Sequence, residues 1–436
     1  MAEESNVLKS WESDYSELFQ NFLKELSQWP DTGTEPRSGN QDIRYYLDLE
    51  EHRLKERGLS MKLDFKAYTQ VSSTSKVVKT VPILNVFEYA RYGQSMSNQT
   101  VEKRVEYFRN GKSVYRNKKD LTAYLTIIEP KKGNENIGEE TYSCPNCGAI
   151  TKIHVLEEEG CPYCRTKYLI TDLFPKVTNY YFLDNATVSE KVDKGMKRYV
   201  FAGMGVFYII GLIFIICSIG SPDFVETLIM TLIGVLIGGS MMGALGGYMI
   251  YSMTLLARTL FKAGKTMPVN IGSAGSRSKI TKTVSKFDPA FSYEYFEGKA
   301  LSLARIVILS PDPANCIQYS GSKIKEYFRE IININYRGGM HLISLQRKGN
   351  VLEVKLQLYL TNTYDTKGKI KEKDEVIYLT LHHNAEFKVV PDFSIKKVEC
   401  PSCGGSFDAT RYQRCPYCNQ KYDVSRDDWI VKDIWK

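Results

Sequence analysis

The cysteines are the residues of this chain whose types and spacing could do chemistry. Eight of the ten fall into four Cys-x-x-Cys pairs, and these pairs form two clusters. The first cluster is Cys144, Cys147, Cys161 and Cys164, and the second is Cys400, Cys403, Cys415 and Cys418. Two such pairs joined by a short hairpin place four thiolates at the corners of a tetrahedron, the geometry that Zn²⁺ prefers. The sequence therefore predicts two bound zinc ions.

We expect both zinc ions to be structural. With all four coordination positions filled by protein sulfur, no position remains for water or substrate, so catalytic zinc is disfavoured. His154 lies between the two pairs of the first cluster, and we interpret it as a surface residue and not as a ligand. Redox-active disulfides are the main alternative. The paired spacing nevertheless suits metal binding in a reducing compartment better than the disulfide framework of a secreted protein.

Two long uncharged segments lie between the two clusters. Residues 199–219 contain no charged residue. As a helix they would be roughly 31 Å long, about the thickness of the hydrocarbon core of a bilayer. Residues 227–257 form a second uncharged run, which is longer than one straight crossing needs. We therefore predict a transmembrane hairpin made of these two helices.

The charges around this hairpin predict its orientation. Basic residues precede the first segment and follow the second, whereas the connecting loop GSPDFVE holds two acids and no base. By the positive-inside rule, both termini and both cysteine clusters are expected in the cytoplasm, with the hairpin in the inner (plasma) membrane. The acidic N-terminus lacks the apolar core of a signal peptide, which agrees with this orientation. Three basic residues after the second segment would meet anionic lipid head groups: Arg258, Lys262 and Lys265.

The second apolar segment carries glycines at intervals of four residues. They are Gly234, Gly238, Gly239, Gly243 and Gly247. Small residues at this spacing allow another helix to approach closely. Two interpretations stay open, namely packing against the glycines of the first segment and self-association of hairpins into an oligomer. Neither segment contains a charged residue, so a proton or ion relay through one hairpin has no support.

The chain on both sides of the hairpin has the pattern of an α+β protein. Residues 351–360 alternate apolar and polar side chains as a half-buried strand does, and Ser292 is placed to cap a helix. A helix over residues 14–26 and strands around residues 61–68 and 121–128 are expected in the N-terminal region. Helices followed by antiparallel strands on each side predict two α+β modules.

Glycines predict where several elements end. Asn110-Gly111 is typical of a tight hairpin turn. Glycine just past a helix end is also the usual stop signal. On this basis one helix is expected to end near Gly58, and a helical stretch is expected to end at Gly338-Gly339, with a strand starting at Met340.

The two modules repeat the same order. CPYCRTKY in the first cluster matches CPYCNQKY in the second, and an aromatic, strand-like run follows each. A tandem duplication of a helix–strands–ribbon–strand unit is the economical explanation. The expected boundaries are an N-terminal α+β domain over 1–143, the first ribbon with its closing strand over 144–184, membrane helices over 199–219 and 227–257, a flexible basic linker over 258–286, a second α+β domain over 287–399, and the second ribbon with its closing strand over 400–436.

The C-terminal region resembles a known family. The segment FDPAFSYEYFEGKALSLARIVIL, the alternating strands after it, and the final run of CPSC, CPYC and DDWIVKDI are similar to bacterial Tim-forty-four-like proteins, with the best match over residues 287–436. These proteins are relatives of the mitochondrial tether that anchors the import motor at the inner membrane. The resemblance implies cone-shaped modules of the nuclear-transport-factor-two-like fold and a membrane-attached transport or scaffolding role. It implies no shared catalytic residues.

These observations favour a non-enzymatic membrane anchor or transport-associated scaffold whose two zinc-stabilised domains bind a protein partner or lipid. The alternative from another class is an oligomeric pore or transport component built from the glycine-rich helix. The net charge of +8 fits an anionic membrane surface or nucleic acid and demands neither. Nucleic acid is the less favoured partner, because three glutamates in the first ribbon hairpin would repel phosphates. No nucleophile or catalytic-metal motif accompanies the five histidines, so we do not expect an enzyme.

Overall fold

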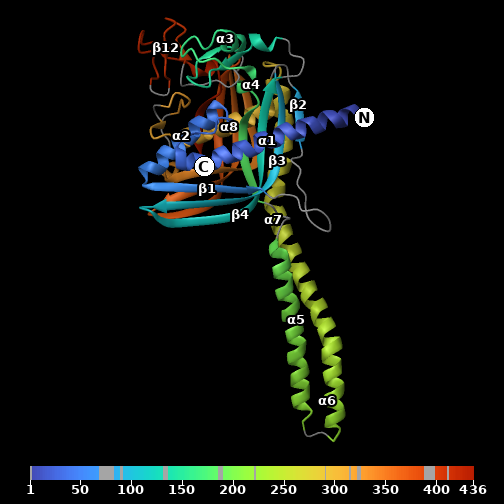
Figure 1. The fold of residues 1–436 in the computed structure, drawn as a ribbon. Helices are drawn as coiled ribbons and strands as arrows, with labels where there is room; N and C mark the ends of the chain where they lie inside the picture. Colours follow the sequence, from blue (N-terminus) through green and yellow to red (C-terminus); the bar gives the residue numbers. More distant parts are fainter. Residues whose placement is uncertain are drawn as a thin grey trace. The chain divides into compact units, whose positions relative to one another are not determined.

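The computed structural model describes the chain apart from residues 1, 68–82, 89–91, 131–135, 185–189, 220–221, 290, 314–315, 322–325, 387–397 and 410–411. It divides into two compact units (Figure 1). Residues 1–185 and 269–436 together form the first unit, which we call the head. Residues 186–268 form the second unit, which we call the hairpin.

The hairpin consists of long apolar helices. Helix α5 is Glu190–Cys217, and the return path is α6 (Phe224–Ile233), a π-helical stretch over Gly234–Gly239, and α7 (Ser240–Val284). Two stretches, Met196–Cys217 and Phe224–Thr254, are long and apolar enough to cross a membrane. Most large apolar side chains along them are exposed.

Helix α7 does not stop where the apolar run ends. It continues to Val284, so the flexible linker expected over residues 258–286 is wrong for most of its length. Ile280 and Val284 are buried in the core of the head, and the Leu342 N–H donates to Ser276 Oγ over 2.8 Å. Packing of its last turns on the head thus overrides a basic, glycine-containing composition that is poor in helix formers.

The first half of the head carries two helices and one antiparallel sheet. The helices are α1 (Ala2–Thr32) and α2 (Gln41–Glu56). The strands are β1 (Leu59–Ala67), β2 (Ile83–Glu88), β3 (Tyr92–Arg109), β4 (Lys112–Pro130) and β7 (Lys176–Asp184). Their order in the sheet is β1-β3-β4-β7, with β2 paired to β3, and all of these pairings are antiparallel.

The second half repeats this plan. Helix α8 (Tyr293–Leu309) and a short 3₁₀ helix, η4 (Glu326–Glu330), precede four strands. The strands are β8 (Ile331–Lys348), β9 (Val351–Thr366), β10 (Lys369–Asn384) and β13 (Ile430–Trp435). They lie in the order β8-β9-β10-β13, so the fold is mixed α+β with antiparallel sheets, as predicted.

A cysteine ribbon is inserted before the last strand of each half. The first contains η1 (Ile137–Glu139), β5 (Thr141–Ser143), β6 (Ile150–Lys152), α3 (Ile153–Glu158) and α4 (Ile170–Leu173). The second contains β11 (Val398–Glu399), β12 (Ser406–Phe407) and η5 (Val424–Arg426). A further likeness links the halves, because Gly39 bridges to Val177 and Tyr319 bridges to Val431, each valine being the second residue of its closing strand.

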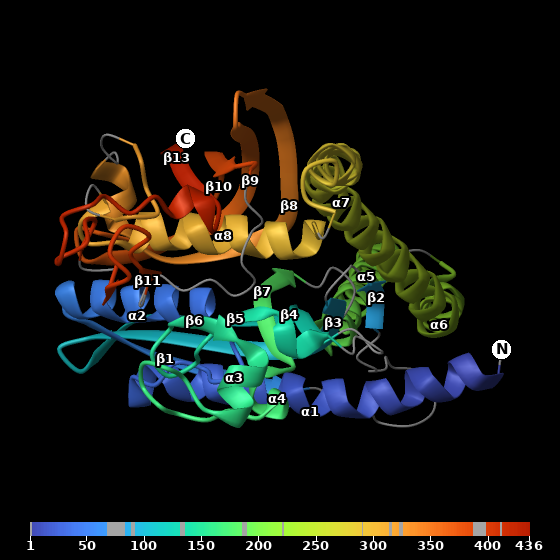
Figure 2. The ribbon, with the colours of Figure 1, turned by 90° about the horizontal axis from the view of Figure 1, so that it is seen from above.

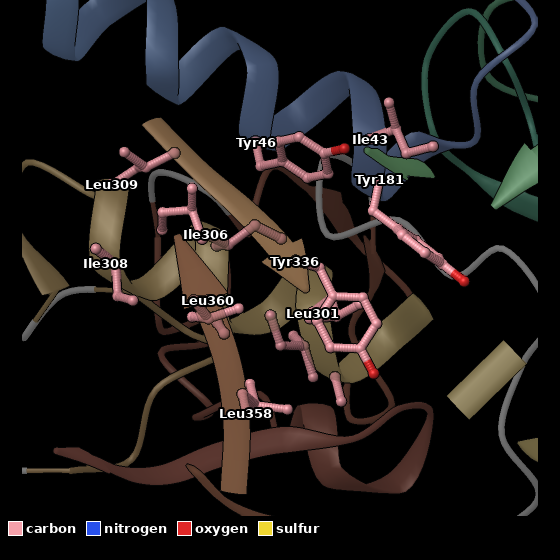
Figure 3. Close-up of a cluster of buried hydrophobic side chains, with 14 of the residues drawn as sticks. Ile43, Tyr46, Tyr181, Leu301, Ile306, Ile308, Leu309, Tyr336, Leu358 and Leu360 are labelled. Carbon is pink, nitrogen blue, oxygen red and sulfur yellow. The ribbon is translucent and has the colours of Figure 1, made fainter. Parts of the chain in front are cut away.

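The two halves share one hydrophobic core, whereas the sequence suggested separate modules. Ile43 and Tyr46 of α2 lie over Ile306 and Leu301 of α8, with Tyr336 beneath them (Figure 3). Figure 2 shows α2 between α8 and β1, and it contacts both. At the junction of the closing strand β7 with β8, the Asn335 side chain accepts from Phe182 N–H and donates to Phe182 O at 3.2 and 2.8 Å.

The expected turn at Asn110-Gly111, the helix end near Gly58 and the cap at Ser292 are confirmed, whereas the elements expected around Gly338-Gly339 are wrong. Asn110 and Gly111 both have positive φ and join β3 to β4, Gly58 follows the end of α2 at φ +62°, and Ser292 caps α8. The predicted helix stop at Gly338-Gly339 is wrong. These glycines lie inside β8, where the register against β9 shifts between Tyr336 and Met340. They therefore make a β-bulge in a strand and end no helix.

Candidate metal centres

The eight predicted ligands gather into two groups of four sulfurs. Within each group all Sγ atoms lie within 4.8 Å of one another. The Sγ–Sγ distances are 3.7 Å for Cys144–Cys164 and 3.5 Å for Cys147–Cys161. In the second group they are 3.5 Å for Cys400–Cys418 and 3.6 Å for Cys403–Cys415. A tetrahedron with metal–sulfur bonds of 2.3 Å has edges of about 3.8 Å, so both groups fit a zinc ion.

The backbone around each Cys-x-x-Cys pair forms the same hydrogen-bonded turn. In the first pair, the Cys144 N–H donates to Ala149 O and the Gly148 N–H donates to Cys144 O at 2.8 and 2.7 Å. Equivalent bonds close the other three pairs. The residue after the second cysteine always has positive φ: Gly148, Arg165, Gly404 and Asn419. Four turns of one geometry, two of them at residues other than glycine, indicate a backbone shaped to hold a metal.

Electrostatics in both groups also favour a cation. Burial raises the pKa of Cys144 above its ordinary value and the pKa of Cys147 to about 11. Although burial opposes it, the N–H groups of Ser402 and Cys403 bring the pKa of Cys400 down to about 7. Four crowded sulfurs can all become thiolates only if a positive ion lies between them, because their negative charges otherwise repel one another.

The two ribbons differ in how deeply they are packed. Cys144 and Cys161 are buried, and their partners Cys147 and Cys164 are half-buried. This first group belongs to an apolar cluster that includes Ile128 of β4, and Tyr295 of α8 packs against that cluster. In the second ribbon Cys403 and Cys418 are exposed. The ribbons are neighbours, since Ile150 packs on the second cluster and the Tyr163 hydroxyl donates to Glu399 over 3.2 Å.

The other candidate residues lie elsewhere. His154 Nδ1 is 2.9 Å from Gly138 O, so this histidine packs beside the ribbon and away from its sulfurs. Arg258, Lys262 and Lys265 lie in α7, but their side chains are outside the described part of the structure. Cys217 is exposed and Cys316 is buried, and neither joins a sulfur group.

The hairpin glycines separate into two sets. Within the hairpin, a Cβ on Gly243 would lie 2.7 Å from Met204 Cα, and one on Gly247 would lie 2.3 Å from Tyr199 O. Gly239 lies near Phe207 at ordinary contact distance. Gly234 and Gly238 meet nothing within 4 Å. The first set therefore brings the two helices together, whereas Gly234 and Gly238 remain open.

Sequence reasoning missed the buried charges that join the halves. Lys299 of α8 makes ion pairs with Asp42 of α2 and with Asp428, the latter at 2.7 Å. Although burial opposes it, these carboxylates hold the pKa of Lys299 well above its usual value. Arg53 of α2 donates to six backbone carbonyls of the other half: Ile308, Leu309, Ser310, Phe328, Arg329 and Ile331. The only local signal was a charged residue on an apolar helix face.

The fold and its sites define a class: a mixed α+β protein with two four-cysteine groups that could hold metal and two helices that could span a membrane. Comparison with known proteins adds no narrower family. No family model matches the chain, and neither a curated protein nor a solved structure does.

Proposed function

We propose that this protein is a non-enzymatic anchor or transport-associated scaffold of the inner membrane. Its hairpin crosses the bilayer twice, and its head stands in the cytoplasm, where two structural zinc ions stabilise the ribbons and the head binds a protein partner or lipid. The observation that carries this proposal is the shared core, which is built from chain segments on both sides of the hairpin.

The shared core constrains topology. Phe22 and Tyr180, before the hairpin, belong to the same core region as Arg305, after it. Such a core forms only when both segments lie in one compartment, which requires an even number of crossings. Two apolar helices supply that number. The basic flanks and the acidic loop with Asp223 and Glu226 then favour a cytoplasmic head.

The closed sulfur groups support a structural role for the metal. Four thiolates complete the shell of Zn²⁺, and each ribbon precedes the closing strand of its half. Zinc would thus fix the path of the chain into β7 and β13. The resemblance of residues 287–436 to Tim-forty-four-like proteins implies a membrane-attached transport or scaffolding role and does not choose between the two.

An oligomeric pore or transport component is the second candidate, and the open pair Gly234 and Gly238 favours it. Gly238→Leu should reduce oligomers in detergent if this face associates with another copy. Gly243→Leu is the matched control, because its side chain would disturb the hairpin itself. An unchanged oligomer size in Gly238→Leu would remove this candidate.

Labelling of cysteines in intact cells tests the anchor. Asp223→Cys, placed in a Cys217→Ser background, should react with a membrane-impermeant thiol reagent from outside. Lys62→Cys, at an exposed position of β1, should react only after lysis. The purified protein should contain two zinc ions per chain. Labelling of Lys62→Cys in intact cells, or recovery of the protein without detergent, would contradict the proposal.

A further inference from the structure

The tips of two long hairpins, one from each half, lie next to one another. The β3–β4 hairpin turns at Asn110-Gly111, and the β9–β10 hairpin turns at Lys367-Gly368. Arg109 Nη2 donates to Asp365 Oδ2 over 2.7 Å, and Lys119 Nζ donates to Glu372 Oε2 over the same distance. We call residues 109–119 and 365–373 the paired tips.

Both carboxylates of the paired tips, Asp365 and Glu372, form ion pairs with basic side chains. Asp365 also forms an ion pair with Arg57. Glu106, which lies beside the first tip, forms an ion pair with Arg116 over 2.7 Å. This leaves four exposed lysines that have no ion pair among the described residues: Lys112, Lys367, Lys369 and Lys371. The outer surface of the paired tips is therefore a concentration of uncompensated positive charge.

The first of the paired tips also carries an exposed apolar side chain, Val114, two residues from Lys112. Phe108 pairs with Ser113 and Tyr107 pairs with Tyr115, so Val114 is the extra residue of a β-bulge. Bulges redirect side chains out of the regular alternation of a strand. Val114 is 39% exposed and belongs to the small set of exposed large apolar side chains of the described head, which also includes Leu169, Ile343 and Val351. The bulge thus presents a valine to solvent beside Lys112 and Arg116.

We propose that the paired tips dock on an anionic phospholipid surface, with Val114 entering the head-group region and the four lysines contacting lipid phosphates. This inference rests on the proposed membrane anchor, which would keep a bilayer surface within reach. Juxtaposed lysines attract anionic lipid, and an apolar tip adds burial at the interface.

A lipid surface fits this site better than nucleic acid. Single-stranded nucleic acid is held by exposed aromatic rings on which bases stack. The aromatic ring nearest the valine, Tyr115, is half-buried and packs against Tyr107 with ring centroids 6.0 Å apart. The paired tips therefore offer phosphate contacts and an apolar contact without a free stacking platform among the described residues.

The test uses the full-length protein in lipid nanodiscs of phosphatidylcholine, with or without phosphatidylglycerol. Val114→Cys in the Cys217→Ser background carries a polarity-sensitive fluorophore, and zinc-loaded Cys217→Ser alone gives the background signal. Emission should shift to shorter wavelength only in discs with phosphatidylglycerol, and added salt should reverse the shift. The variant K112E/K369E should lose it, whereas K24E/K421E, which changes two exposed lysines elsewhere, should retain it.

The outcomes separate this inference from the anchor itself. Protein that co-elutes with both kinds of disc but shows no shift, or shows the same shift without phosphatidylglycerol, overturns lipid docking and leaves the anchor intact. Protein that enters neither kind of disc overturns both. Salt-sensitive binding of a single-stranded oligonucleotide that K112E/K369E abolishes, in the absence of a lipid-dependent shift, would assign the paired tips to nucleic acid.

Discussion

The two halves of the head have the same strand order, but they differ in their second helix. In the first half α1 is followed by the Ser38-Gly39 segment and then by the 16-residue helix α2. In the second half α8 is followed by Ser320-Gly321 and only the five-residue η4. Helix α2 extends over both halves, and its Arg53 reaches carbonyls at the end of α8 and the start of β8. The two halves are therefore not interchangeable, because one supplies a helix that the other lacks.

The two cysteine ribbons also differ, and the ribbon of the first half is the more deeply buried one. The first ribbon belongs to an apolar cluster that includes Ile128 of β4 and against which Tyr295 of α8 packs. It is also bound to α2, since the Arg44 side chain donates to Pro145 O over 3.0 Å. The second exposes half of its cysteines. The first half thus holds the more deeply integrated elements, and the second depends on them.

The largest expected effect is loss of folding when the halves are separated. A protein in which a flexible Gly/Ser linker replaces residues 186–268 should remain folded and hold two zinc ions, because the head is one compact unit. Residues 287–436 alone should not fold, because they lack Arg53 and α2. Near-ultraviolet circular dichroism and thermal unfolding would measure both. A cooperative transition in residues 287–436 alone would show that the second half folds without the first.

The next effect concerns the buried ion group at Lys299. Lys299→Met should destabilise the linker-joined head by about 3–5 kcal/mol, because it leaves Asp42 and Asp428 buried without a cation. Denaturant unfolding measures the change. Lys299→Arg keeps the charge and serves as the control, with a smaller loss. If Lys299→Met were as stable as the parent protein, the halves would not depend on this contact.

Glu50 should make the association of the halves sensitive to pH. Burial raises its pKa to about 7, although Asn333 of the other half donates to the carboxylate over 2.7 Å. Between about pH 4.5 and 7 the folded state keeps a proton that the unfolded state loses, so stability falls as pH rises, by up to roughly 1.4 kcal/mol per pH unit.

Glu50→Gln removes this titration and tests the sign. Relative to the parent protein, the variant should gain stability on going from pH 5 to pH 8, as measured by denaturant unfolding with zinc present. The exposed Glu157→Gln is the control and should track the parent protein. An equal stability difference at both pH values would show that Glu50 does not titrate in this window.

Short-range patterns predicted the parts of the molecule that are set by near neighbours. The Cys-x-x-Cys pairs, the cap at Ser292 and the turn at Asn110-Gly111 each involve residues close in sequence, so local geometry decides them. The glycine rule failed at Gly338-Gly339, where pairing of β8 with β9 outweighs the local preference.

The shared core could not be predicted in this way. The hydrogen bonds of Arg53 join residues more than 250 positions apart, and no periodicity in one segment reports a partner at that distance. Periodicity marks a buried face but does not say what covers it. The same limit hid Lys299, whose two carboxylate partners come from α2 and from the residue that leads into β13.

The smallest expected effect is a difference in the rate at which the two ribbons lose metal. A chelator should remove zinc in two phases, with the second ribbon faster by about tenfold, because Cys403 and Cys418 are open to solvent whereas the first group is covered by its apolar cluster. Absorbance of a zinc indicator follows the release. Cys418→Ser should eliminate the fast phase and leave the slow one, and Cys164→Ser should do the reverse. A single phase in the parent protein, or an exchange of these assignments, would show that burial in the head does not control metal retention and that the two ribbons are equivalent.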